Sequence, residues 1–133
     1  MTSPMFDDTP FPYSLAGKWA SVVRALAIHE SHEDPQIRGH NDGNHAFGLL
    51  QQHIPFMWEW YFNREPIHDI PWPDAQILAA ANFLDHYTSL GWKLDNLIQA
   101  YNLGVGDFLN GKRNPEYLAA YKTALTSFGG IEP

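Results

Sequence analysis

The sequence predicts a mainly α-helical protein with five to seven helices and one irregular loop or small β-hairpin after the first long helix. Apolar residues recur at helical spacing in several segments, and helix-capping and helix-stopping residues separate these segments. The 133 residues fit a single domain, 1–133, and 44% of them are hydrophobic, which is enough for a core. We expect residues 1–13 to form an extended N-terminal arm, because this segment is acidic and interrupted by prolines.

The first helix is predicted over residues 15–32. Its apolar residues follow the i, i+3, i+4, i+7, i+8 pattern of a helix with one buried face, and they are Trp19, Val22, Val23, Leu26 and Ala27. Glu30 occupies the next position of this apolar stripe. Residues 36–50 lack helical rhythm and are rich in turn formers, so they are predicted as the long loop or β-hairpin.

Four further helices are predicted from their start and stop signals. Proline favours the first turn of a helix, aspartate and asparagine favour the N-cap, and glycine favours the position after the last turn. The signals are Pro55 for the start of the second helix, Asp74 and Gly91 for the third, Asp95 and Gly104 for the fourth, and Asn114 and Gly129 for the fifth.

Composition and charge exclude several classes of protein. The chain has no cysteine, which excludes a disulfide framework, a thiolate metal site and a cysteine nucleophile. Eight Lys and Arg against fifteen Asp and Glu give a formal net charge of −7, which argues against nucleic acid and anionic membranes as partners. No apolar stretch approaches the roughly 20 residues that span a bilayer, and the N-terminal segment lacks a signal peptide's features. We therefore expect synthesis in the cytoplasm.

Glu30 is the strongest candidate for a catalytic group. A carboxyl that continues an apolar stripe is partly buried, and burial disfavours its charged form. The C-terminal end of a helix adds partial negative charge. Both effects raise the pKa, and a carboxyl that is protonated near neutral pH suits the general acid of glycosidic bond cleavage. The alternatives are a solvent-facing side chain or a buried ion pair with Arg24 or Arg38.

Four short motifs follow one another along the chain. They are Glu30-Ser31 with Asp34-Pro35, the run Ala46-Phe47-Gly48-Leu49-Leu50-Gln51, Gln76-Ile77 with Ala80 and Phe83-Leu84, and Ala100-Tyr101-Asn102 before the turn at Gly104. A final helix with Tyr117 also fits. In this order, over residues 19–125, the motifs resemble those of the lysozyme-like family that contains the soluble lytic transglycosylases. The resemblance implies a lysozyme-like fold and an enzyme that cleaves the glycan strands of peptidoglycan.

The resemblance also implies roles for individual residues. Glu30 would protonate the glycosidic oxygen between N-acetylmuramic acid and N-acetylglucosamine. It would then take the proton of the muramyl C6 hydroxyl, which closes a 1,6-anhydro ring. The hydroxyl of Tyr101 would point at Glu30, and Gln51 would bind sugar groups in the cleft.

Other residues in or beside these motifs are candidates for binding substrate. Phe47 and the aromatic residues of 58–62 offer flat surfaces for pyranose rings, although helical spacing favours core positions for most of them. Ser31 and Asn102 lie in the same motifs, and hydrogen bonds to the backbone are their alternative role.

A hydrolytic alternative depends on Asp42. The gap between Glu30 and Gln51 is longer than in the soluble transglycosylases, and the extra residues fall within 39–45. A hydrolase needs a second carboxylate that activates water at about 6.5–9.5 Å from the acid. Asp42, or else Asp34, could supply it, as in the goose-type lysozymes. A further alternative is a non-catalytic assembly module with the same fold, which the presence of Glu30 disfavours.

The segment His29-Glu30-Ser31-His32 comes within one position of a zinc-binding His-Glu-x-x-His motif. Glu33 stands where the second histidine is required, so we expect no metal and no cofactor. A small cysteine-free lytic domain without a secretion signal resembles those of bacteriophages, which act as endolysins or as virion parts. The expected place of action is the bacterial cell wall, with peptidoglycan as substrate and virion or secretion-machine proteins as further partners.

Overall fold

The structure, a computed structural model, describes residues 11–38 and 46–133. This part of the chain is mainly helical, as predicted, with six α-helices, a 3-10 helix and a π-helical turn, and without strands. The elements are η2 (Tyr13–Trp19), α1 (Ala20–Ser31), α2 (Ile54–Met57), η3 (Trp58–Phe62), α3 (Trp72–Ser89), α4 (Leu94–Leu103), α5 (Val105–Leu109) and α6 (Pro115–Ser127). Residues 36–50 were expected to form a long loop or a β-hairpin. In this region Phe47 forms isolated antiparallel bridges with Arg38 and with Gln52.

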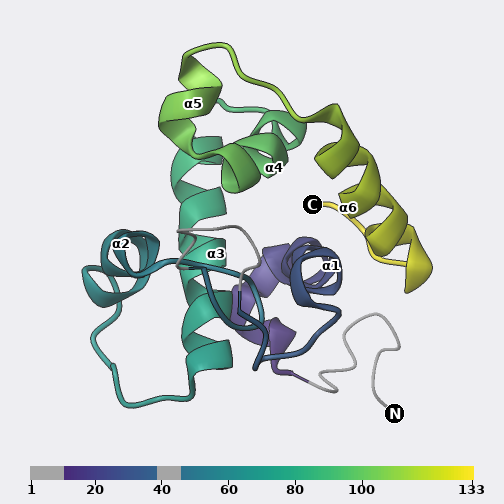
Figure 1. Ribbon diagram of the computed structural model, residues 1–133. Coiled ribbons are helices and arrows are strands. Elements are labelled where there is room, and N and C mark those ends of the chain that lie inside the picture. Colours follow the sequence, from purple (N-terminus) through teal and green to yellow (C-terminus); the bar gives the residue numbers. More distant parts are fainter. Residues whose placement is uncertain (1–10, 39–45) are drawn as a thin grey trace.

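The longest helix, α3, runs through the middle of the molecule (Figure 1). α1 packs against η2 and α6, while α3 packs against η2 and η3. α4 and α5 lie beyond the C-terminal end of α3, and α6 lies beside α1 (Figure 1). Hydrogen bonds join the last turn of α1 to Leu49 on one side and to Tyr117 of α6 on the other. The C-terminal end of α1 therefore lies where three parts of the chain meet.

The first predicted helix forms as two consecutive helices. η2 contains Gly17 in the left-handed region, with φ of +58°, and α1 continues from Ala20. The predicted apolar stripe is buried, and each of its large side chains contributes about 1.5–3 kcal/mol on burial. The indole N–H of Trp19 donates to Asp85 at 2.6 Å, which ties this region to α3. The stripe thus faces the core, with Glu30 at its end.

Helix starts were predicted with mixed success. Asn114 caps α6 as predicted, because its side chain accepts a backbone N–H of the first turn. The predicted N-caps Asp74 and Asp95 were wrong, since α3 begins at Trp72 and α4 at Leu94. Both aspartates lie in the first turn, where their charge faces the positive end of the helix dipole. Asp74 and Asp95 therefore stabilise the starts of α3 and α4 through their charge and not as N-cap residues.

Two further boundaries differ from the prediction. α5 was not predicted; it has five residues and follows Gly104, the predicted stop of α4. Of the predicted N-terminal arm, residues 1–10 lie outside the described part, and Tyr13 is a buried residue of η2. No helix in residues 11–38 and 46–133 is both long and apolar enough to cross a membrane.

Candidate active site

Glu30 lies in the last turn of α1 with its carboxyl partly buried. Burial raises the pKa of Glu30 to about 7, while a hydrogen bond from Tyr117 lowers it. This is the direction predicted from the apolar stripe. Neither alternative ion pair forms within the described residues, because Arg24 pairs with Glu33 and Arg38 has no acidic partner there. Glu30 therefore holds its proton to a much higher pH than a solvent-exposed glutamate does.

Two tyrosines contribute hydroxyl groups near Glu30. The hydroxyl of Tyr117 on α6 donates to Glu30 Oε2 at 2.5 Å. The hydroxyl of Tyr101 on α4 instead donates to the carbonyl of Leu50 at 2.7 Å, so it does not donate to Glu30 as the resemblance implied. Burial, followed by the charge of Glu30, raises the pKa of both tyrosines well above the usual range. Both hydroxyls therefore stay protonated and remain donors.

His29 packs against one of these tyrosines, Tyr117. Its ring contacts the Tyr117 ring edge-on, with 4.7 Å between the ring centroids. Burial, assisted by the neighbouring His32, lowers the pKa of His29. The imidazole is thus neutral at neutral pH. A neutral ring adds no charge beside Tyr117, so burial and the hydrogen bond from Tyr117 determine the pKa of Glu30.

Gln76 of α3 holds the turn that faces the end of α1. Its side chain is fully buried, accepts the N–H of Leu50 and donates to the carbonyl of Phe47, each at 2.9 Å. Gly48 lies between them with φ of +82°, and a Cβ there would come within 2.9 Å of the Gln76 amide. Gln76 had been noted from the sequence only as part of a motif, and the structure shows that it fixes this turn.

The two glutamines of this turn have different surroundings. Both N–H bonds of the Gln51 amide are used by the backbone, at 2.9 Å to Ile37 and 3.0 Å to Gly48. Only its oxygen is left for a ligand. Gln52 is buried and donates to the Gln76 carbonyl at 2.9 Å and to the Tyr101 hydroxyl at 3.2 Å. The sequence pointed to Gln51, and Gln52 is the one that contacts a tyrosine of the site.

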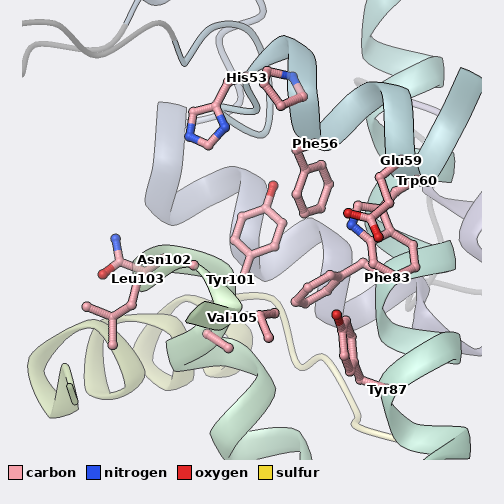
Figure 2. A pocket seen from close by; sticks show the side chains of 13 residues that line it. His53, Phe56, Glu59, Trp60, Phe83, Tyr87, Tyr101, Asn102, Leu103 and Val105 are labelled. Atoms are coloured by element: carbon pink, nitrogen blue, oxygen red, sulfur yellow. The ribbon is translucent and has the colours of Figure 1, made fainter. Parts of the chain in front are cut away.

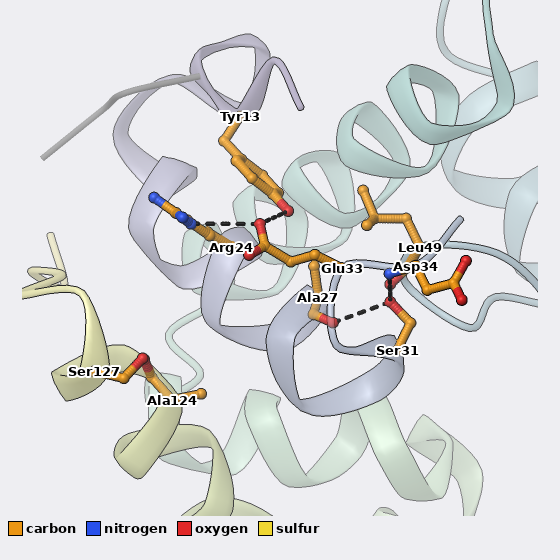
Figure 3. A network of polar contacts seen from close by, with 9 residues as sticks. All are labelled: Tyr13, Arg24, Ala27, Ser31, Glu33, Asp34, Leu49, Ala124 and Ser127. Carbon is orange, nitrogen blue, oxygen red and sulfur yellow. Dashed lines mark hydrogen bonds and ion pairs between the residues drawn. The ribbon is translucent and has the colours of Figure 1, made fainter. Parts of the chain in front are cut away.

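Ser31 connects α1 to the same turn (Figure 3). Its hydroxyl donates to the carbonyl of Leu49 at 2.7 Å, lies 3.1 Å from the carbonyl of Ala27, and accepts the N–H of Asp34 at 3.2 Å. These partners are all backbone groups, and Ser31 is fully buried. Its geometry therefore matches the backbone role named above as the alternative to substrate binding.

The chain leaves α1 through two left-handed residues, His32 with φ of +54° and Glu33 with φ of +60°. This conformation costs a non-glycine residue about 1–2 kcal/mol. Contacts of Glu33 offset part of that cost, because its carboxylate accepts the Tyr13 hydroxyl at 2.6 Å and lies 3.4 Å from Arg24 Nε (Figure 3). This network holds the segment that follows Glu30 directly.

A pocket of about 300 Å³ opens beside Tyr101, between the α2–η3 segment and α4. Several aromatic side chains line it, and Figure 2 shows Phe56 facing the Tyr101 ring, with His53 and Asn102 on the border of the pocket. Phe56 and Tyr101 meet edge-on, with 5.5 Å between centroids. Tyr101 connects this pocket to the surroundings of Glu30, because the charge of Glu30 contributes to the raised pKa of Tyr101. Asn102 is exposed, and its side-chain oxygen accepts a 2.8 Å hydrogen bond from Asn114.

The remaining sequence candidates do not gather in one place. Trp60 and Tyr61 of the aromatic group are buried in the core, whereas Trp58 is exposed. Phe47 lies in the turn beside Trp72, and Asp42 lies outside the described residues. In the described ranges, histidines and carboxylates form no group of three that could hold a metal ion.

Comparison with known proteins identified a family for this chain. Residues 15–123 match the family model of the transglycosylase SLT domain. No curated protein and no solved structure matched the chain. The match includes α1 with Glu30, the turn held by Gln76, and Tyr101 and Tyr117. The chain therefore belongs to the transglycosylase SLT domain family, whose members are peptidoglycan lytic transglycosylases that cleave glycosidic bonds.

Proposed function

We propose that the protein cleaves the β-1,4 bond between N-acetylmuramic acid and N-acetylglucosamine and leaves 1,6-anhydromuramyl ends. One observation carries the proposal: Glu30 has a pKa of about 7 and is bound by the Tyr117 hydroxyl. Such a carboxyl donates its proton at neutral pH, and the anion that remains accepts a proton in the next step. The same group thus serves both halves of the reaction.

In the first step, protonated Glu30 donates to the glycosidic oxygen, and the bond electrons leave with the N-acetylglucosamine. Positive charge develops at the muramyl C1. In the second step, the Glu30 carboxylate takes the proton of the C6 hydroxyl, and that oxygen bonds to C1. The anhydro ring closes and Glu30 is protonated again, so the reaction consumes no water. Tyr117 orients the carboxyl in both steps.

The neighbouring carboxylates support this reaction over hydrolysis. Hydrolysis by inversion needs a second carboxylate that activates water. Glu33 is occupied by Tyr13 and Arg24, and Asp34 accepts the backbone N–H of Gln36 at 2.9 Å. In the described part of the chain, both acidic residues closest in sequence to Glu30 are thus engaged elsewhere. Asp42 remains the candidate for a hydrolase.

The pocket beside Tyr101 supports a sugar ligand. Aromatic walls with a few polar groups at the rim are typical of sites for small organic groups. Asn102 and His53 offer hydrogen bonds at the rim, and the pocket's volume of about 300 Å³ admits a hexosamine ring. We assign the free Gln51 oxygen to an N–H of an N-acetyl group.

The test is mass spectrometry of the muropeptides released from purified peptidoglycan in water enriched in ¹⁸O. The proposal expects anhydromuramyl ends without ¹⁸O and no release by Glu30→Gln. Reducing ends that carry ¹⁸O would establish a hydrolase, and Asp42→Asn would then abolish release. If the wild type and Glu30→Gln clear the wall equally, or if neither does, the protein is not an enzyme that works through Glu30.

A further inference from the structure

A second pocket lies between residues 35–38, the turn at Phe47 and Gly48, and the start of α3. Its volume is about 620 Å³, and its residues are distinct from those of the pocket beside Tyr101. Apolar side chains form most of the lining, with Arg38 and Gln36 as the polar members. The mechanism proposed above does not use this pocket.

Trp72 gives the pocket an exposed aromatic surface. It is the first residue of α3, and 51% of its surface is exposed. Phe47 and Phe62 meet its ring edge-on, at centroid distances of 5.6 Å and 6.2 Å. An exposed indole that neighbours hold in place loses little conformational freedom when a ligand stacks on it. The face of a pyranose ring, with its axial C–H bonds, is such a ligand.

Arg38 and Gln36 add hydrogen-bond donors beside this indole. Across residues 11–38 and 46–133, neither the Arg38 guanidinium nor the Gln36 side-chain amide has a hydrogen-bond or ion-pair partner. A guanidinium presents five N–H donors in a planar fork, and an amide presents both a donor and an acceptor. Hydroxyl, acetamido and lactyl carboxylate groups on amino sugars match these partners.

The pocket shares its wall with the candidate active site. Ile37 and Gly48 line the pocket, and their carbonyls accept the two N–H bonds of Gln51. The carbonyl of Leu50, the residue before Gln51, accepts a hydrogen bond from the Tyr101 hydroxyl. Hydrogen bonds therefore connect the wall of this pocket, through Gln51 and Leu50, to Tyr101 of the candidate active site.

We propose that this pocket binds a pyranose ring of the same glycan strand, with the Trp72 indole as stacking platform and Arg38 and Gln36 as hydrogen-bond donors. The inference rests on the proposed function, because its ligand is the strand that Glu30 cleaves. It adds a distal sugar subsite, which favours long strands over short ones.

The experiment measures binding of soluble glycan strands, freed of peptides by an amidase, to the Glu30→Gln protein by calorimetry. In that background, Trp72→Ala and Arg38→Gln should each raise Kd about three- to tenfold, and Trp72→Phe should retain most of the affinity. Ile67→Ala is the control, because Ile67 is 65% exposed and lies outside the pocket. Thermal unfolding identifies any variant that has lost its fold, and Arg38→Gln does not alter the aromatic packing.

In the active protein, Trp72→Ala should raise KM for long strands and leave kcat unchanged. The inference is overturned if Glu30→Gln binds strands and the Trp72 and Arg38 variants bind equally well, a result that leaves the proposed function intact. It is also overturned if these variants weaken the binding of strands that carry peptides but not the binding of peptide-free strands, because the pocket would then bind peptide. A wild type that neither binds nor cleaves strands overturns both proposals.

Discussion

The hydroxyl of Tyr117 donates a 2.5 Å hydrogen bond to Glu30 from 87 positions further along the chain. This bond lowers the pKa of Glu30, whereas burial raises it to about 7. Tyr117→Phe removes the lowering contribution, so the pKa should rise further. We expect the alkaline limb of the kcat/KM profile to move to higher pH by about 0.5–1 pH unit. We also expect kcat to fall about tenfold, because the carboxyl loses its orientation.

Tyr121→Phe is the matched control for this prediction. Tyr121 lies one turn further along α6, and its hydroxyl donates to Glu132 at 2.8 Å. Its loss should leave the alkaline limb in place. A limb that moves to lower pH in Tyr117→Phe, or that moves equally in both variants, would contradict the assignment.

The raised pKa of Glu30 also predicts how stability depends on pH. The folded state holds this proton more tightly than the unfolded chain, because the pKa rises from 4.5 to about 7. Wild-type stability therefore falls as the pH rises through this window. Glu30→Gln should be more stable than the wild type above pH 7 by about 1–3 kcal/mol, and the gain should vanish below about pH 4.

Urea unfolding at pH 4 and pH 8 measures this difference. Glu116→Gln serves as the control, because Glu116 is exposed in the first turn of α6 and its replacement should produce no such gain. An equal stability difference at both pH values would show that Glu30 titrates as in the unfolded chain.

Gly48 is predicted to tolerate no side chain. It has φ of +82°, and a Cβ would lie 2.9 Å from the Gln76 amide. Gly129 has φ of +68° but nothing within 4 Å of such a Cβ. Gly129→Ala should cost about 1–2 kcal/mol of unfolding free energy from backbone strain alone. Gly48→Ala should cost more unfolding free energy than that and should reduce kcat, because Gln76 could no longer hold the turn in place. Equal losses of stability in the two variants would contradict this prediction.

Glu33 is predicted to be a positioning residue for Glu30. Glu33→Ala removes the partner of Tyr13 and leaves Arg24, whose side chain is only 19% exposed, without its ion pair. We expect a loss of about 1–3 kcal/mol in stability and a lower kcat with little change in KM. The exposed pair of Lys112 and Asp107 provides the control.

A double-mutant cycle of Tyr13→Phe and Glu33→Gln measures the coupling within this network, and Asp107→Ala should change neither stability nor activity. Full activity and full stability in Glu33→Ala would show that the left-handed turn does not depend on these contacts.

The partial burial of Glu30 and the direction of its pKa shift could be predicted from the sequence because their signal is local. The apolar stripe of α1 and the end of the same helix both lie within a few turns, and the two effects act on one side chain. The Asn114 cap was predictable for the same reason. The starts of α3 and α4 were not, because an aspartate stabilises both the cap and the first turn, and its presence does not distinguish these positions.

The partners of Glu30 could not be predicted in this way. Tyr117 reaches the carboxyl only because α6 packs on α1, a contact between segments far apart in the chain. Gln51 and Gln52 are adjacent, and Gln52, which follows the left-handed backbone of Gln51 with φ of +48°, is the one that contacts Tyr101. Such long-range packing has no counterpart in local spacing.

Arg38 and Phe47, which flank residues 39–45, are held together by contacts of their own backbone and that of their neighbours. Arg38 and Phe47 form a bridge, and the N–H of Gly48 donates to Ile37 at 2.9 Å. The entropy of closing a loop on such a base changes only slowly with loop length. We therefore expect that segments of other lengths or sequences can be grafted between these two residues while Gln76 and Glu30 keep their places. The position between Arg38 and Phe47 is therefore where we would insert foreign sequences first in an engineered variant of this domain.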